Sequence, residues 1–222
     1  YEGQVWYDKS SGTLRSVVNF GAWSSGGSLV TPGFLSAAFG SQTAAVNVGG
    51  QIPGPVFRND TQEYNGTGWS SGTDYPSNIT NSGRGGTSTA GIVLGGNTPP
   101  YTTAANEYDG STWTSTGALP TAGDNFGSCS TETQTNGIFA QGRNPSSGNA
   151  GNDKTFTYDG STFSAGPDIN TGRIFSQSSG GTGTAGIVYG GFIDPSPNAM
   201  TNTEEYDGSS WTNGGALNRA SG

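Results

Sequence analysis

The fold is decided by a stretch that recurs along the chain, Glu107-Tyr108-Asp109-Gly110-Ser111-Thr112-Trp113. Its copies are Glu63-Tyr64-Asn65-Gly66-Thr67-Gly68-Trp69, Thr157-Tyr158-Asp159-Gly160-Ser161-Thr162-Phe163, Glu205-Tyr206-Asp207-Gly208-Ser209-Ser210-Trp211 and a degenerate fifth, Asn19-Phe20-Gly21-Ala22-Trp23. The final aromatic residues stand at positions 23, 69, 113, 163 and 211, at intervals of 46, 44, 50 and 48 residues. A self-similar unit of this period predicts an array of repeated supersecondary modules.

A second block, Thr89-Ala90-Gly91-Ile92-Val93-Leu94-Gly95-Gly96, lies between these stretches. Its copies are Thr43-Ala44-Ala45-Val46-Asn47-Val48-Gly49-Gly50, Thr135-Asn136-Gly137-Ile138-Phe139-Ala140-Gln141-Gly142 and Thr184-Ala185-Gly186-Ile187-Val188-Tyr189-Gly190-Gly191. The Thr and the last Gly are always 7 residues apart, and the Tyr and the following Trp or Phe always 5. The last Gly and the next Tyr are 14, 12, 16 or 15 residues apart. Fixed spacing predicts strands, and variable spacing predicts a surface loop.

Each repeat is expected to form four short strands, and no segment has helical periodicity. Segments such as 33–39 and 173–178 are candidates for the first strand. The Thr-Ala-Gly-Ile-Val block predicts a buried second strand, the Glu-Tyr pair the third, and Trp-Thr or Trp-Ser the start of the fourth. Asp-Gly or Asn-Gly between the last two predicts a tight hairpin turn with positive φ at both residues. Tyr and Trp are expected to pack between neighbouring units.

These repeats resemble the kelch family, in which a double glycine closes one strand and a Tyr and a Trp follow at fixed spacing. The resemblance covers residues 20–217 and implies an all-β, kelch-like β-propeller of four-stranded blades, about five in number. The Tyr-to-Trp interval is shorter than in typical kelch units, and the third repeat departs at Gln141, Thr157 and Phe163. Structural roles follow for Trp23, Gly50, Tyr64, Trp69, Gly96, Tyr108, Trp113, Gly142, Tyr158, Phe163, Gly191, Tyr206 and Trp211.

Residues 1–15 read as strand, polar turn and strand, and resemble a hairpin of phage tail-fibre and virion proteins. We therefore expect a hairpin over residues 1–17, which is also a candidate to close one blade, and propeller repeats over 18–222, the last repeat truncated. The resemblance implies a non-enzymatic virion structural or host-attachment protein of a bacteriophage, located in the virion in multiple copies. Its expected partners are other virion subunits, host surface glycans, or both.

Composition excludes several other functions. The chain has 222 residues, a formal net charge of −8 and only 8 Lys and Arg, which disfavours nucleic acid and anionic membranes as partners. No apolar run is long enough for membrane insertion. Histidine is absent and Cys129 is the single cysteine, so catalytic triads and the usual zinc, copper and haem sites are not expected. No cofactor or metal is predicted.

Two motifs could be mistaken for active sites. The segment Gly181–Gly186 matches GxGxxG, but it leads into a predicted strand rather than a helix. The glutamates Glu63, Glu107 and Glu205 could be proposed as glycosidase carboxylates. They occupy the same position in different repeats, which favours a repeated hydrogen-bonding or solvated position over convergence on one site. A glycan-degrading propeller enzyme and a cellular kelch interaction module remain alternatives.

The variable loops are the predicted functional surface. If the repeats form a propeller, these loops all emerge on one face, where Phe57, Tyr101, Phe192 and Met200 are candidate ligand- or partner-binding residues. Proline-stiffened loops that present single aromatic residues suit stacking on sugar rings or contact with a protein. The alternative is that these side chains only cover the propeller face.

Overall fold

A computed structural model describes residues 5–8, 13–16, 25–54, 56–128, 134–140, 142–144, 152–174, 177–178, 181–193 and 196–221. This part of the chain contains strands, bridges and turns but no helix, which confirms the all-β expectation. No helix that could span a membrane occurs among these residues.

Four antiparallel sheets of four strands each contain most of the strands in the described chain. Sheet 1 comprises β3 (Ala37–Ser41), β4 (Ala44–Ile52), β5 (Val56–Tyr64) and β6 (Trp69–Ser71). Sheet 2 comprises β7 (Gly83–Thr87), β8 (Ala90–Leu94), β9 (Ala105–Tyr108) and β10 (Trp113–Ser115). Sheet 3 comprises β11 (Gly127–Ser128), β12 (Gly137–Ala140), β13 (Thr155–Tyr158) and β14 (Phe163–Ala165). Sheet 4 comprises β15 (Gln177–Ser178), β16 (Gly186–Tyr189), β19 (Thr203–Tyr206) and β20 (Trp211–Asn213).

Two further strand pairs lie outside these sheets. The strands β17 (Phe192–Ile193) and β18 (Ser196–Ala199) form a hairpin within the connection between β16 and β19. The strands β1 (Val5–Asp8) and β2 (Thr13–Ser16) form the expected N-terminal hairpin, in which Val5 pairs with Ser16. This hairpin joins none of the four sheets, so it does not close one of them. The degenerate repeat at Trp23 lies outside the described residues.

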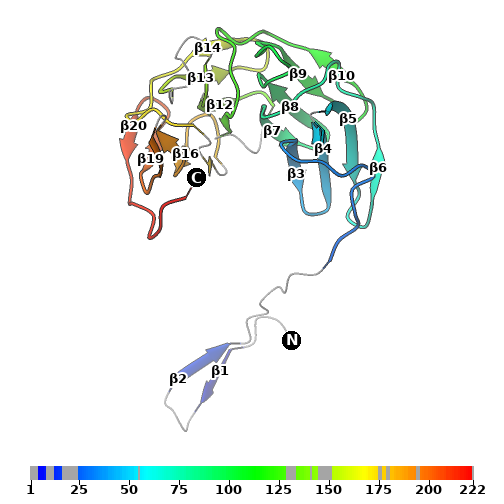
Figure 1. The fold of residues 1–222 in the computed structure, drawn as a ribbon. Coiled ribbons are helices and arrows are strands. Elements are labelled where there is room, and N and C mark those ends of the chain that lie inside the picture. Colours follow the sequence, from blue (N-terminus) through cyan, green and yellow to red (C-terminus); the bar gives the residue numbers. More distant parts are fainter. Residues whose placement is uncertain are drawn as a thin grey trace.

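The sheets follow one another around an arc, with the first strand of each toward the inside and the fourth toward the outside (Figure 1). Neighbouring first strands are in contact, β3 with β7, β7 with β11, and β11 with β15. Backbone hydrogen bonds continue this inner row, because Asn81 N donates to Leu35 O at 3.0 Å and Asn125 N donates to Asn81 O at 2.8 Å. All three residues have positive φ, between 53° and 60°. The described sheets therefore meet along their first strands.

The predicted second, third and fourth strands are confirmed in all four sheets, whereas the first strands begin later than expected. In sheet 1 the strand is Ala37–Ser41 rather than 33–39, and Phe34 makes only a single bridge to Gln51. In sheet 4 the strand is Gln177–Ser178, at the end of the expected 173–178. The segment before β3 leads into the first of the four sheets, and the segment before β15 links sheet 3 to sheet 4.

The double glycine that follows the apolar run of the second strand in sheets 1, 2 and 4 has a backbone reason; in sheet 1 the strand continues past it to Ile52. Gly49 and Gly50 both have positive φ, 63° and 97°, and Gly50 N donates to Ile79 O of the following linker at 2.8 Å. A Cβ atom on Gly50 would lie 2.8 Å from Phe34 O. Because glycine alone adopts positive φ readily and leaves room for the linker, the pair recurs as Gly95-Gly96 and Gly190-Gly191.

The hydrophobic core is divided into three clusters, each between two consecutive sheets. The first contains Ala37, Phe39, Val46, Val48, Tyr75, Ile79, Val93 and Tyr108, with Trp113 packed against it. The second contains Ile92, Leu94, Ala105, Leu119, Phe126, Phe139, Phe156 and Tyr158, with Phe163. The third contains Ile138, Ala140, Ile169, Val188, Tyr206 and Trp211. The Tyr and the Trp or Phe of each later sheet thus pack against the preceding sheet, as predicted.

Candidate functional site

The sheets present two different ends. The loop face carries the connections between second and third strands and the linkers between sheets. The turn face carries the connections between third and fourth strands, at residues 65–68, 109–112, 159–162 and 207–210. On the turn face, acidic side chains are hydrogen-bonded within their own turns, whereas the loop face exposes apolar side chains. The loop face is therefore the candidate site.

On the turn face, each acidic side chain is used to hold its own turn. Asp109 accepts hydrogen bonds from Ser111 N at 2.8 Å, Ser111 Oγ at 2.9 Å, Thr112 N at 2.7 Å and Thr112 Oγ1 at 3.0 Å. These hydrogen bonds, led by that from Thr112 N, lower the pKa of Asp109 to about 2. Asp159 and Asp207 have the same capping arrangement and the same pKa of about 2. Their carboxylates therefore serve the turn rather than a ligand.

The geometry of these turns corrects one prediction. Tyr108 pairs directly with Trp113, so four residues form the loop, and Asp109 N donates to Thr112 O at 3.3 Å. Only the glycine has positive φ, 95° at Gly110, whereas the Asp does not. The expected positive φ at both the Asp and the Gly is therefore wrong. The Asp side chain instead stabilises a four-residue loop by accepting hydrogen bonds from residues within that loop, as Asp and Asn commonly do in turns.

The repeated glutamates lie between sheets. Tyr158 Oη donates to Glu107 Oε1 at 2.8 Å, and Tyr108 Oη donates to Glu63 Oε1 in the same way. Burial, with a further contribution from the Glu107 carboxylate, raises the pKa of Tyr158 to about 12. Glu63 and Glu107 thus occupy a repeated hydrogen-bonding position. Glu205, the corresponding residue of sheet 4, is exposed.

The structure places three of the four predicted loop residues at the surface of the loop face and buries the fourth. Phe57 lies on β5 opposite Gln51, Tyr101 is bridged to Asn97, and Phe192 lies on β17; all three are half-buried. Met200 is only 8% exposed and is bridged to Ser221. Its side chain is therefore buried rather than part of a contact surface.

Several apolar residues that no sequence pattern marks are more exposed than Phe57, Tyr101 and Phe192. The large hydrophobic side chains exposed in the described part of the chain are Val30, Phe34, Leu35, Val56 and Ile193, at 53%, 48%, 44%, 49% and 44%. Val30, Phe34 and Leu35 lie on the linker into β3, and Val56 and Ile193 on connections between second and third strands. Phe34, Leu35, Val56 and Ile193 therefore belong to the loop face, whereas Val30 lies beside β5, where the neighbouring Thr31 N donates to Gln62 Oε1 at 3.1 Å. They have no counterpart in the repeat pattern, so no periodic signal marks them.

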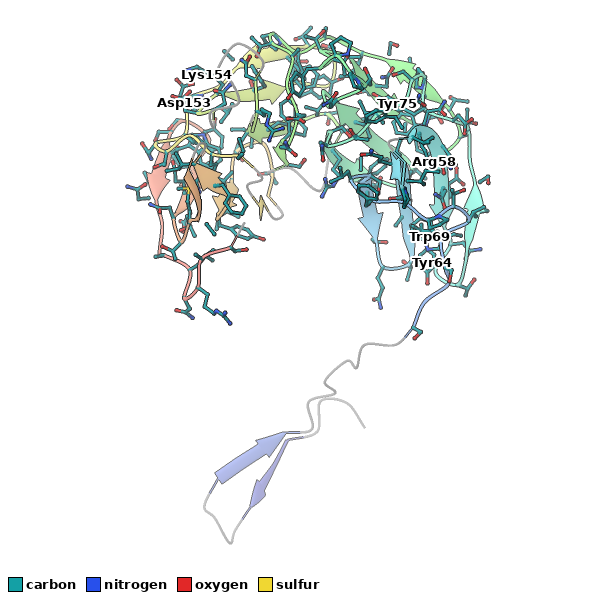
Figure 2. The ribbon with its side chains drawn as sticks, viewed as in Figure 1. Arg58, Tyr64, Trp69, Tyr75, Asp153 and Lys154 are labelled. Carbon is teal, nitrogen blue, oxygen red and sulfur yellow. The ribbon has the colours of Figure 1, made fainter. Side chains whose placement is uncertain are left out.

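Charged groups near the linkers are paired with one another. Arg173 and Glu204 form an ion pair whose side chains are 1% and 0% exposed, and Arg173 also donates to the carbonyl oxygens of Gly190 and Asn202. Asp124 is buried next to Arg143, and burial raises its pKa to about 6. At the surface, Lys154 Nζ lies 2.5 Å from Asp168 Oδ2 and 3.2 Å from Asp153 Oδ1 (Figure 2). Arg58 Nε lies 2.6 Å from Asp60 Oδ1. The Arg173–Glu204 pair attaches the linker before β15 to β19, whereas Arg58 and Asp60 both lie on β5.

The residues that the structure describes contain no group of three or more metal-ligating side chains. The segment Gly181–Gly186 leads into the strand β16, as its sequence context predicts. No protein-family model matches the chain, and no curated protein is significantly similar to it.

Proposed function

We propose that the chain is a kelch-like propeller array that serves as a non-enzymatic structural or host-attachment protein of a phage virion. Each four-stranded sheet is then a blade, and the inner row of first strands surrounds the propeller axis. The loop face is the contact surface, and its partners are neighbouring virion subunits or glycans of the host surface. The repeated Glu, Tyr and Trp belong to the scaffold that holds these loops.

The observation that carries this proposal is the difference between the two faces. The turn face uses its polar side chains internally, in capped Asp-Gly turns. The loop face carries four of the five large hydrophobic side chains that are exposed in the described chain, together with the half-buried aromatic rings of Phe57, Tyr101 and Phe192. Exposed apolar side chains gathered on one face mark contact surfaces. Aromatic rings suit stacking on sugars and packing against protein.

Such a surface would act through many weak contacts. Single aromatic residues on separate loops give little affinity each, but copies fixed in one particle bind together and gain avidity. The net charge of −8 reduces non-specific attraction to nucleic acid and anionic lipid. A virion component that must stay soluble before assembly benefits from this charge.

The first experiment is to purify the particles and quantify the chain in them by mass spectrometry. We expect a fixed copy number per particle, whereas absence from purified particles would overturn the virion assignment in favour of a cellular interaction module. The isolated chain is then tested on a glycan array and against purified virion subunits. Hydrolysis of an arrayed glycan would overturn the non-enzymatic assignment.

The contact face is tested with matched variants. We expect Phe34→Ser combined with Val56→Ser to weaken binding to the partner at least tenfold, because each removes an exposed apolar contact. Ser70→Ala, on the outer strand β6, should leave binding unchanged. Equal loss in both variants, or no loss in the first, would remove the loop face as the contact surface.

A further inference from the structure

We propose that Asn65 is a self-catalysed deamidation site, at which the backbone of Gly66 converts the side-chain amide into a carboxylate. Asn65 stands in the turn of sheet 1 at the position that Asp109, Asp159 and Asp207 occupy in the other three sheets. This modification goes beyond the proposed contact function and depends only on the geometry of the turn.

The side-chain carbonyl of Asn65 is held by three donors. Its Oδ1 atom accepts hydrogen bonds from Thr67 N at 3.0 Å, Thr67 Oγ1 at 2.8 Å and Gly68 N at 3.0 Å. Donors that converge on a carbonyl oxygen draw electron density from its carbon and stabilise the negative charge that develops when a nucleophile adds there. The hydrogen bonds within the turn therefore activate the Cγ atom of Asn65 toward attack by a nucleophile.

The nucleophile is the next backbone nitrogen. Gly66 lies outside the strands, and its N–H makes no hydrogen bond within the described part of the chain. Gly66 has a φ of 91° and no side chain to hinder approach, and Asn65 is exposed to water. The nitrogen can therefore lose its proton to solvent and approach the neighbouring Cγ.

The reaction is balanced without any outside oxidant or cofactor. Gly66 N loses a proton and bonds to Asn65 Cγ, and the negative charge of the addition product rests on Oδ1. The bond from Cγ to the side-chain nitrogen then breaks, and that nitrogen leaves as ammonia after taking up a proton. Water opens the resulting cyclic imide, which gives aspartate by attack at the side-chain carbonyl or isoaspartate by attack at the backbone carbonyl.

The turns of the other sheets show how this fold would bind the aspartate product. The Asp109 carboxylate accepts the same two backbone donors and the same hydroxyl that Asn65 accepts, and it accepts a further hydroxyl from Thr112. Hydrogen bonds to a carboxylate are stronger than those to a neutral amide. Conversion to aspartate therefore strengthens the turn and adds one negative charge. Isoaspartate inserts a methylene into the backbone and disturbs the pairing of Tyr64 with Trp69.

The chain contains two internal controls with the same dipeptide. In Asn213-Gly214, the glycine nitrogen donates to Thr203 O at 3.0 Å, so the nucleophile is engaged. In Asn136-Gly137, the glycine begins β12 in register with Tyr158, so its backbone is fixed in a strand. If the dipeptide alone governed the reaction, all three sites would convert at similar rates. If the turn governs it, Asn65 converts first.

The test incubates the folded chain at mildly alkaline pH in water enriched in heavy oxygen, then digests it under acid conditions for mass spectrometry. Isotopic label should enter position 65 about 100-fold or more faster than positions 136 and 213, the effect that one aligned donor at an oxyanion typically has. Asn65→Asp supplies the elution standard for the aspartate product. Equal or faster labelling at either control position would overturn the proposal.

A second variant tests the activating role of the donors. Thr67→Val keeps the size of the side chain and the backbone donor but removes the hydroxyl on Asn65 Oδ1. We expect it to slow labelling at position 65 without changing positions 136 and 213. Labelling of Thr67→Val at the parent rate would show that the turn does not activate the amide.

Discussion

The hydroxyl of Tyr158 in sheet 3 donates a hydrogen bond of 2.8 Å to the carboxylate of Glu107 in sheet 2. The same pair, Tyr108 and Glu63, joins sheet 2 to sheet 1. Sequence positions that repeat about every 46 residues thus meet across the boundary between consecutive sheets. The repeat specifies the interface between units as well as the unit itself.

Glu107→Ala should lower the free energy of unfolding by about 1 kcal/mol, because it leaves a buried tyrosine hydroxyl with one partner fewer. The matched control is Glu205→Ala, at the same repeat position but exposed. That change should have little effect. Denaturant midpoints of the two variants measure the difference. Similar losses would mean that the glutamate acts within its own strand rather than between sheets.

The buried ion pair of sheet 4 should be far more sensitive than the surface pairs. Glu204→Gln removes the charge that compensates Arg173, and breaking a buried pair from one side costs about 3–5 kcal/mol. Lys154→Ala removes an exposed pair with Asp168 that solvent screens, so it should change stability far less. Thermal unfolding of both variants checks this ranking, and a reversed order would contradict the described packing around Arg173.

Asp124 makes stability depend on pH in an unusual direction. Its folded pKa is about 6, above the value of about 3.9 for an unfolded aspartate, so the folded state binds the extra proton between these values. Stability contributed by this group is present below about pH 4 and is lost as the pH rises through 6. Asp124→Asn should remove this slope, whereas the exposed Asp74→Asn should retain it. Urea unfolding at pH 4 to 7 measures the slopes; parallel curves for parent and Asp124→Asn would refute the assignment.

Gly91 should be intolerant of a methyl group because Phe39 of the preceding sheet covers it. A Cβ atom there would lie 2.1 Å from Phe39 Cε2. Gly91→Ala should therefore cost about 1–3 kcal/mol, the usual penalty for overpacking. Adding Phe39→Leu should recover part of the loss. If the loss in the double variant equals the sum of the two single losses, position 91 and Phe39 do not meet.

The strands with side-chain patterns could be predicted from the sequence, and those without could not. The second strand is a β-branched apolar run and the fourth starts at an aromatic residue, so both strands can be predicted from the sequence. The first strand of sheet 2 contains three glycines, Gly83, Gly85 and Gly86, and that of sheet 3 is only Gly127–Ser128. These strands are held by backbone pairing and contact with the neighbouring sheet, which leave no hydrophobic period to detect.

The loop face was predictable as a location but not in its residues. The variable spacing marks where insertions are tolerated, and the structure places these connections at one end of the sheets. Which side chains remain exposed depends on single contacts. Met200, whose backbone is bridged to Ser221, is buried, whereas Leu35, which has a positive φ, is 44% exposed. Such contacts join segments that share no repeat position.

The most direct test of the proposed contact surface is hydrogen–deuterium exchange of the chain when free and when held in purified particles. Exchange should slow at residues 51–54 and 98–102 of the loop face and stay unchanged at turn residues 109–112 and 207–210. Slower exchange confined to the turns, or no difference at the loop segments, would contradict the assignment of the loop face as the contact surface.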